Sequence, residues 1–182
     1  MHVFVGLGNP DSKYADTKHN AGFWVLDELS RRWNIPFRPG KGDYLYGKSK
    51  SILMIKPTTG MNNSGIAVKQ AMAYFAFQTE DIVVVLDDVD LPLGKIRVRP
   101  KGGDGCHRGL ESVIYHIGTT GFPRFRYGIS TGEKTRPAEH FVLKPFRKSD
   151  KPLAAEMVHS TADAVESFLK HGITFTMNTY NS

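Results

Sequence analysis

The sequence predicts a single α/β domain over residues 1–182, a sandwich in which helices flank one twisted, mixed β-sheet. The first observation is length, because 182 residues suffice for one domain with a substantial core. The second is composition, since 40% hydrophobic and 23% charged residues are ordinary values for globular proteins. The third is the order of elements, in which short β-branched runs are interspersed with segments of helical periodicity.

The first half of the chain is expected to contain three strands and two helices. The strands are predicted at residues 3–6, 44–46 and 52–55. A helix from His19 or Asn20 to Arg32 is indicated by Phe23, Leu26, Leu29 and Trp33 at helical spacing. A second helix through about Phe77 could be capped by Asn62, Asn63 or Ser64. Its expected apolar stripe is Ile66, Ala67, Ala71, Tyr74 and Phe75.

The second half begins with the clearest strand, residues 81–86, whose continuous β-branched run predicts burial on both faces. Residues 95–99 alternate as a half-exposed strand does, and a helix at 108–117 and a strand at 125–129 follow. Ser149 or Asp150 can cap a last long helix, with Pro152 in its first turn and Gly172 past its end.

Charge and cysteine content restrict the class of protein. The net charge is +6, and residues 94–151 hold 13 Lys/Arg against 5 Asp/Glu, which fits either a polyanion partner or a solvated basic face. The single Cys106 excludes an internal disulfide framework. Apolar runs such as 83–86 are far shorter than a membrane span, and the N-terminus lacks a signal-peptide pattern. A cytoplasmic location without membrane association is therefore expected.

Two glycine motifs suggest nucleotide binding but lack the required context. The segment 6–11 begins like a dinucleotide fingerprint, yet Asp11 takes the third glycine position and Pro10 interrupts the turn into a helix. The segment 42–49 matches the phosphate-loop pattern GxxxxGK[ST] in its letters. A phosphate loop must open a helix, whereas both the interior of this segment and the residues after Ser49 favour strands. An NTPase is therefore an alternative hypothesis that we do not favour.

Two further groups of reactive side chains are assigned structural roles. Asp87, Asp88 and Asp90 could bind a divalent cation, but neighbours on one strand point to opposite faces. Cys106 and His107 suggest a nucleophile pair, but adjacent residues rarely have the geometry for it. We expect Cys106 to be buried as a small apolar residue.

Four segments, namely 6–22, 56–65, 86–94 and 101–110, differ from ordinary surface or core sequence. They include Gly6-Leu7-Gly8-Asn9-Pro10, Lys18-His19-Asn20-Ala21-Gly22, Gly60-Met61-Asn62-Asn63-Ser64-Gly65 and Gly105-Cys106-His107-Arg108-Gly109. Taken together and in this order, they resemble bacterial peptidyl-tRNA hydrolases. The resemblance continues through residues 122–129 and 141–143 to 172–173, so it spans nearly the whole chain.

The resemblance implies an enzyme that cuts the ester joining a peptide, or another N-blocked aminoacyl group, to the 3′ end of tRNA. It assigns His19 as the general base that activates water and Asp87 as its partner. Histidine suits this role because its free pKa is about 6.5, although a histidine at a helix start is more often a surface residue or a cap. Asn9 and Asn62 match the family's active-site amides, which can position substrate and stabilise an oxyanion.

Further binding residues and two departures also follow from the resemblance. Tyr14 and Met61 are expected beside the substrate. Arg108 stands where members commonly have Asn, so it can donate to a tRNA phosphate but cannot accept a hydrogen bond. Gly60 replaces a bulky aromatic residue, which should widen the groove for the peptide. Basic side chains expected to grip acceptor-stem phosphates are Arg97, Arg99 and Lys101.

The partner implied is therefore peptidyl-tRNA, bound through its acceptor stem and 3′ end by a monomeric enzyme without metal or organic cofactor. One rival is an RNA-binding protein that keeps this scaffold without catalysis, as relatives in organelle intron splicing do. The joint presence of His19, Asp87, Asn9 and Asn62 argues against that rival.

Overall fold

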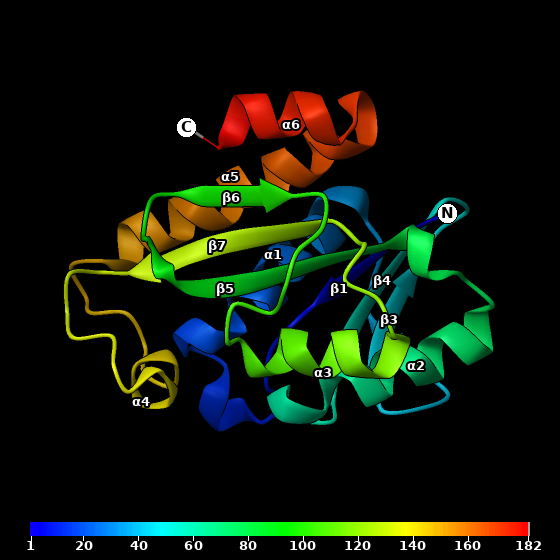
Figure 1. Cartoon of the computed structure of the whole chain (residues 1–182), viewed down its shortest axis with the longest axis horizontal. Coiled ribbons are helices and arrows are strands. Elements are labelled where there is room, and N and C mark those ends of the chain that lie inside the picture. The colour runs from blue at the N-terminus through cyan, green and yellow to red at the C-terminus, as the bar shows by residue number, and fades with distance from the viewer. Residues whose placement is uncertain (182) are drawn as a thin grey trace.

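Seven strands form one mixed sheet, in the order β2-β3-β4-β1-β5-β7-β6, in the computed structural model, which describes residues 1–181 (Figure 1). The strands are β1 (His2–Gly6), β2 (Arg38–Pro39), β3 (Tyr44–Lys48), β4 (Ile52–Pro57), β5 (Ile82–Pro92), β6 (Ile96–Arg99) and β7 (Arg124–Ser130). Strands β4, β1, β5 and β7 are parallel to one another. Because these four strands are parallel, their carboxyl ends lie at the same edge of the sheet. Antiparallel pairings complete the sheet on both sides.

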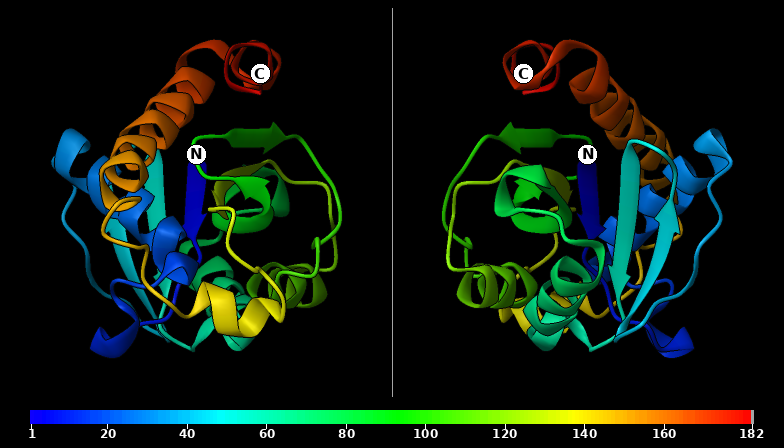
Figure 2. Two further views of the ribbon diagram at one scale, coloured as in Figure 1. Left: turned by 90° about the vertical axis from the view of Figure 1, so that its left-hand side faces the viewer. Right: turned by 90° about the vertical axis from the view of Figure 1, so that its right-hand side faces the viewer.

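Helices cover both faces of the sheet, as Figure 2 shows. They are α1 (Ala21–Trp33), α2 (Ser64–Phe75), α3 (Arg108–Ile117), α4 (Ala138–Val142), α5 (Lys151–His171) and α6 (Ile173–Tyr180). Helices α1 and α5 pack with Phe4, Val83 and Val85, whereas α2 and α3 pack with the opposite strand faces. No helix within residues 1–181 has the length and apolar character needed to cross a membrane.

The predicted α/β sandwich is confirmed, with differences in particular elements. Strand β5 continues past Leu86 to Pro92, because its pairing with β7 resumes after a register shift between Asp88 and Pro92. Strand β2 and the short helices α4 and α6 were not predicted. On α2 the buried stripe is Ala67, Val68 and Ala71, so Ile66 and Tyr74 are exposed rather than buried.

The phosphate-loop interpretation of residues 42–49 is wrong, as its context indicated. Residues Tyr44–Lys48 form β3, and the chain turns at Ser49 directly into β4, which pairs with β3. The element directly after this segment is a strand rather than a helix, so its backbone N–H groups do not converge as a phosphate cradle requires.

A close approach of backbone segments places the start of α1 over the sheet. A Cβ atom added to Gly22 would lie 2.5 Å from the Val85 carbonyl oxygen and 2.6 Å from backbone atoms of Leu7. Only glycine allows this contact without displacing one of the backbone segments. His19 precedes Gly22 in a 3₁₀ turn (Lys18–Asn20), and Asp87 follows Val85 on β5. The contact therefore brings the two side chains to the same edge of the sheet.

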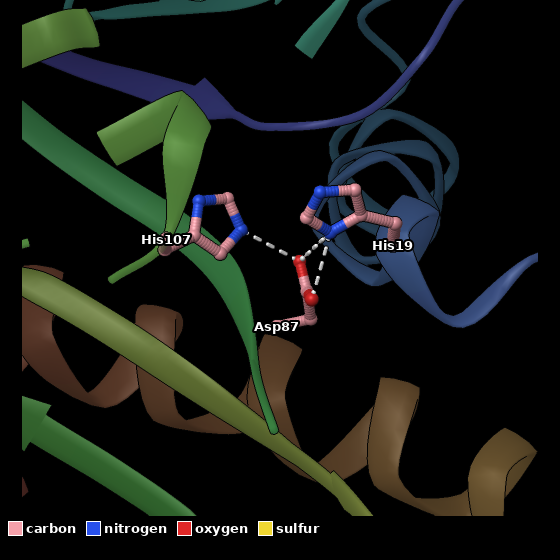
Figure 3. Close-up of side chains that lie close together, drawn as sticks. All are labelled: His19, Asp87 and His107. Carbon is pink, nitrogen blue, oxygen red and sulfur yellow. Dashed lines mark hydrogen bonds and ion pairs between the residues drawn. The ribbon is translucent and has the colours of Figure 1, made fainter. Parts of the chain in front are cut away.

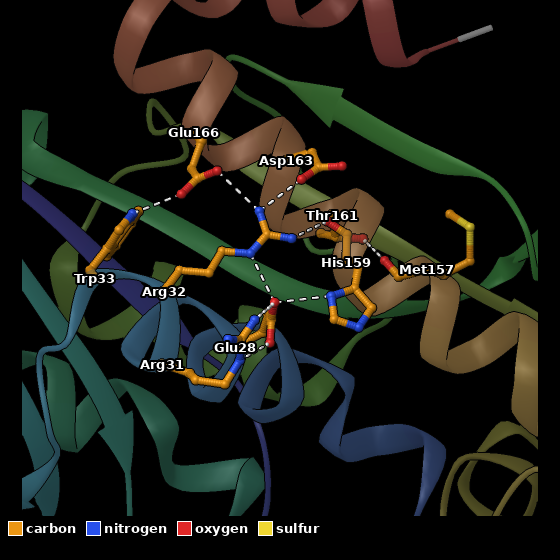
Figure 4. Close-up of polar contacts among 9 residues, drawn as sticks. All are labelled: Glu28, Arg31, Arg32, Trp33, Met157, His159, Thr161, Asp163 and Glu166. Atoms are coloured by element: carbon orange, nitrogen blue, oxygen red, sulfur yellow. Dashed lines mark hydrogen bonds and ion pairs between the residues drawn. The ribbon is translucent and has the colours of Figure 1, made fainter.

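A charge network joins α1 to α5 on the face remote from α2 and α3 (Figure 4). The buried Glu28 carboxylate accepts hydrogen bonds from Arg31 at 2.7 and 3.0 Å, from Arg32 at 2.8 Å and from His159 at 2.9 Å. Hydrogen bonds from Arg31, joined by those from Arg32 and His159, lower the pKa of Glu28 to about 2 although burial acts against this. Arg32 also reaches Asp163 and Glu166 on α5, so this carboxylate helps to fix α1.

Candidate active site

A cavity of about 1080 Å³ lies at the carboxyl edge of the parallel strands, which is where open α/β sheets commonly bind ligands. Its walls come from the loop after β1, the segment before α2, the end of β5, the loop before α3, and α4. The predicted catalytic and substrate-binding residues that line it are Asn9, Tyr14, His19, Met61, Asn62, Asp87 and Arg108. Arg97, Arg99 and Lys101 lie outside these walls, on β6 and just after it. Their contact with tRNA stays a prediction.

His19 and Asp87 form a buried pair (Figure 3). The His19 Nδ1 atom lies 3.0 and 2.9 Å from the two Asp87 carboxylate oxygens. The side chains are only 11% and 1% exposed, so little solvent screens the contact. With Nδ1 committed to the carboxylate, the second ring nitrogen carries the lone pair of neutral His19 and points away from Asp87.

His107 is a third member of this group, and sequence reasoning missed its role. Its Nε2 atom lies 2.9 Å from Asp87 Oδ1, while its Nδ1 atom accepts a hydrogen bond from the Leu110 N–H at 3.2 Å. Since Nδ1 accepts, the proton of neutral His107 resides on Nε2 and is donated to Asp87. The only signal in the sequence was its position in the segment before α3. Cys106 was expected to be buried, but it is exposed in the loop that enters α3, where it lines the cavity and adopts a left-handed conformation (φ 63°).

The electrostatics of the group follow from burial and mutual attraction. Burial alone would raise the pKa of Asp87, but the adjoining His19 and His107 hold that pKa well below its usual range. Burial acts to lower the pKa of His19, yet the Asp87 carboxylate outweighs it and the net pKa is raised. Asp87 is therefore ionised, and His19 becomes a neutral base only above its raised pKa.

Asn9 is fixed in orientation by three hydrogen bonds. Its Oδ1 atom accepts the Met61 N–H at 2.8 Å, and its backbone N–H and C=O bond to the Asn20 side chain at 2.8 and 3.0 Å. With its oxygen occupied, the side-chain NH₂ of Asn9 is the group left to donate into the cavity. Asn62 is exposed in the same wall, and the residue that precedes α2 is Asn63. The helix-cap alternative for Asn62 is therefore wrong.

Gly60 and Arg108, the two departures from the family's usual residues, both line the cavity. Each directly precedes a member of a close contact, because a Cβ atom on Gly109 would collide with Met61 Sδ. Gly60 has φ 81°, and no atom lies within 4 Å of the position that a Cβ atom would take, which leaves open space there. The Arg108 side chain is 72% exposed and has a weak 3.5 Å contact to Glu111.

The remaining acidic residues of β5 do not form a cation site with Asp87. Asp88 lies 3.7 Å from Arg126, and Asp90 lies 2.7 Å from Arg136. A metal ion could instead meet the ligand atoms of His19, Asp87 and His107, which lie within 4.8 Å of one another. Such an ion would have to displace the hydrogen bonds that both histidines make to Asp87.

The chain is similar to known proteins over its whole length. A sequence model described as peptidyl-tRNA hydrolase matches residues 3–182. The chain is 41% identical over 185 residues to the peptidyl-tRNA hydrolase of Geobacillus kaustophilus, with 100% of each chain covered. It is 40% identical over 186 residues to that of Bacillus subtilis, covering 100% of this chain and 99% of the relative. The crystal structure of peptidyl-tRNA hydrolase from Acinetobacter baumannii superposes with a TM-score of 0.90 at 30% identity, covering 100% of this chain and 95% of the other.

Proposed function

The chain belongs to the peptidyl-tRNA hydrolase family, and on this premise we propose that it hydrolyses the ester between a peptide and the 3′ end of tRNA. The products are a free peptide and a tRNA that can be charged again. The observation that carries the mechanism is the buried contact between His19 Nδ1 and Asp87, because it leaves the other ring nitrogen of a cavity-lining histidine to act as a base.

Water is the nucleophile in the proposed reaction. The free nitrogen of His19 takes one proton from water as the oxygen attacks the ester carbonyl, and the imidazolium that forms is stabilised by the Asp87 carboxylate. When the tetrahedral intermediate collapses, His19 returns this proton to the departing ribose oxygen. The net change is addition of one water molecule across the ester. General-base assistance of this kind is worth about 10²–10⁴-fold in rate.

His107 modulates the base through the shared carboxylate. Asp87 Oδ1 accepts from both histidines, so the negative charge is divided between them. The Leu110 N–H keeps His107 in the tautomer that donates to Asp87. This arrangement keeps Asp87 ionised and oriented, while limiting how far it raises the pKa of His19.

Asn9, Asn62, Tyr14 and Met61 are proposed to position the scissile ester. The Asn9 NH₂ group, whose orientation is fixed by the Met61 N–H, is suited to donate to the developing oxyanion. Arg108 and the basic side chains Arg97, Arg99 and Lys101 are proposed to hold tRNA phosphates, in contacts that depend on salt rather than on base sequence. We propose that the protein works as a monomer in the cytoplasm, with no metal or organic cofactor.

The test is release of peptide from N-blocked aminoacyl-tRNA, with free aminoacyl-tRNA as a control substrate. His19→Ala is expected to abolish release while keeping the fold, and His171→Ala at the end of α5 is a matched control that should retain activity. Near-normal turnover by His19→Ala would refute the mechanism. A wild-type protein that binds tRNA without releasing peptide would refute the activity and favour the noncatalytic RNA-binding alternative.

A further inference from the structure

Lys18 is a buried lysine that the proposed chemistry does not use. The residue is 2% exposed and directly precedes His19 in the 3₁₀ turn. Its ammonium group lies 3.4, 3.4 and 3.2 Å from the carbonyl oxygens of Phe141, Lys144 and Pro145. Within residues 1–181, no carboxylate lies within ion-pair distance of it. Burial lowers the pKa of Lys18, because an ammonium group loses its hydration in the interior. The three carbonyl oxygens accept hydrogen bonds in place of that water.

Residues 141–146 make further contacts with Lys18 and with its neighbour Thr17. The ammonium lies 4.1 Å from the centroid of the Phe141 ring and 5.5 Å from that of Phe146, which is cation–π geometry. The Lys18 backbone N–H donates to the Lys144 carbonyl at 3.1 Å, and Thr17 forms a β-bridge with Pro145. Side chain and backbone together attach the His19 turn to residues 141–146.

Residues 141–146 include the end of α4, and α4 forms one wall of the cavity. Ala138, Glu139, Val142 and Leu143 line this wall. A helix of 5 residues is too short to be stable by itself, so its position depends on tertiary contacts. The last carbonyl groups of a helix have no partners within it, and here the Lys18 ammonium supplies donors at that end.

We propose that Lys18 is a positioning residue that holds the α4 wall against the turn carrying His19, so that wall and base keep a fixed spacing. The inference rests on the proposed function of the cavity. Its physical basis is that one buried cation contacts the end of α4 while its own backbone neighbour is His19. Loss of the cation should free α4 while leaving the His19–Asp87 contact intact. Substrate binding should then suffer more than the chemical step.

The test compares Lys18→Met, which keeps the length of the side chain but cannot donate, with Lys18→Arg, which can. Lys18→Met is expected to raise KM about tenfold, to change kcat by less than about threefold, and to speed amide hydrogen exchange in residues 138–144 at least about tenfold. Lys18→Arg should restore KM and exchange towards wild type. Lys151→Met is the matched control, because Lys151 contacts Asp16 nearby but is 52% exposed, and it should change neither quantity.

Unchanged KM and unchanged exchange in Lys18→Met would overturn the proposal, as would Lys18→Arg behaving like Lys18→Met. If Lys18→Met does not fold, hydrogen exchange of the wild type in increasing denaturant decides. The amides of Lys18 and of residues 140–144 should open at one free energy, and separate opening would refute the coupling. These exchange results do not depend on catalysis. Failure of the proposed function would appear separately, as wild-type protein that does not release peptide.

Discussion

Replacing Asp87 with Asn tests whether the carboxylate tunes His19 as a base. The change keeps the shape of the side chain and removes its charge. At the observed 2.9 Å separation, a charge pair with an effective dielectric constant of about 20 is worth about 6 kcal/mol. An Asn oxygen still accepts one hydrogen bond, worth about 1 kcal/mol. The stabilisation lost by the imidazolium is therefore about 4–5 kcal/mol, which corresponds to about a 10³-fold fall in kcat.

The pH profile of the same variant gives a second, independent readout. His19 must be neutral to accept a proton, so wild-type kcat/KM should fall as pH decreases through its raised pKa. In Asp87→Asn the attraction that raises this pKa is gone, while burial still lowers it. The acidic limb of the profile should therefore move to lower pH even though the maximum rate is much smaller.

The assay is hydrolysis of N-blocked aminoacyl-tRNA between pH 5 and 9, with thermal melting to verify folding. Asp90→Asn is the matched control, because Asp90 also lies on β5, is paired with Arg136 at 2.7 Å and does not line the cavity. It should retain nearly full activity. A loss of less than tenfold in Asp87→Asn, or an acidic limb that does not move, would refute this account of His19.

Two further predictions concern the scaffold that carries the site. Glu28→Gln should lower Tm at pH 7 by a few degrees. The difference in Tm from wild type should shrink as pH falls from 4.5 towards 2, because the lowered pKa of Glu28 stabilises the fold only where the carboxylate is ionised. Thermal melting as a function of pH measures this, and Glu156→Gln, at an exposed position of α5, is the control. Gly22→Ala should destabilise the protein by about 1–3 kcal/mol and reduce hydrolysis, because its Cβ would meet the backbone of Val85 and Leu7. Denaturant unfolding checks this against Gly103→Ala, which meets nothing within 4 Å, and equal stability of the two variants would contradict it.

Most helices and strands were predictable because hydrophobic periodicity and capping residues are local features of the sequence. The helix Arg108–Ile117 was predicted at its observed bounds, and Gly172 ends α5 as expected. The extension of β5 to Pro92 was not visible, since it depends on hydrogen bonding to β7, about forty residues away in sequence. Helix α4 was missed for the same reason, because five residues give no periodicity and Lys18 anchors it from a distant segment.

The candidate site was predictable where the resemblance to a family names the residue, and not where spatial partners decide a residue's role. Asp87 was paired with His19 through the resemblance to a family, and the structure brings the two into contact. His107 could not be assigned, because nothing in its neighbourhood indicates that one ring nitrogen would accept from Leu110 while the other donates to Asp87. Cys106 was expected to be buried from its residue type, but its exposure is set by its place in the loop that enters α3, which residue type does not reveal.

Gly60 and Arg108 together affect which residues can orient the attacking water. Both residues line the cavity: Gly60 leaves open space where a side chain would stand, and Arg108 adds an exposed guanidinium with only a weak contact to Glu111. A guanidinium donates hydrogen bonds but cannot accept one from water. In the proposed mechanism, orientation of the attacking water therefore falls to His19 and to amides that can accept. Asn9 already accepts the Met61 N–H at its side-chain oxygen, so the exposed Asn62 amide in the same wall is proposed to accept from the attacking water.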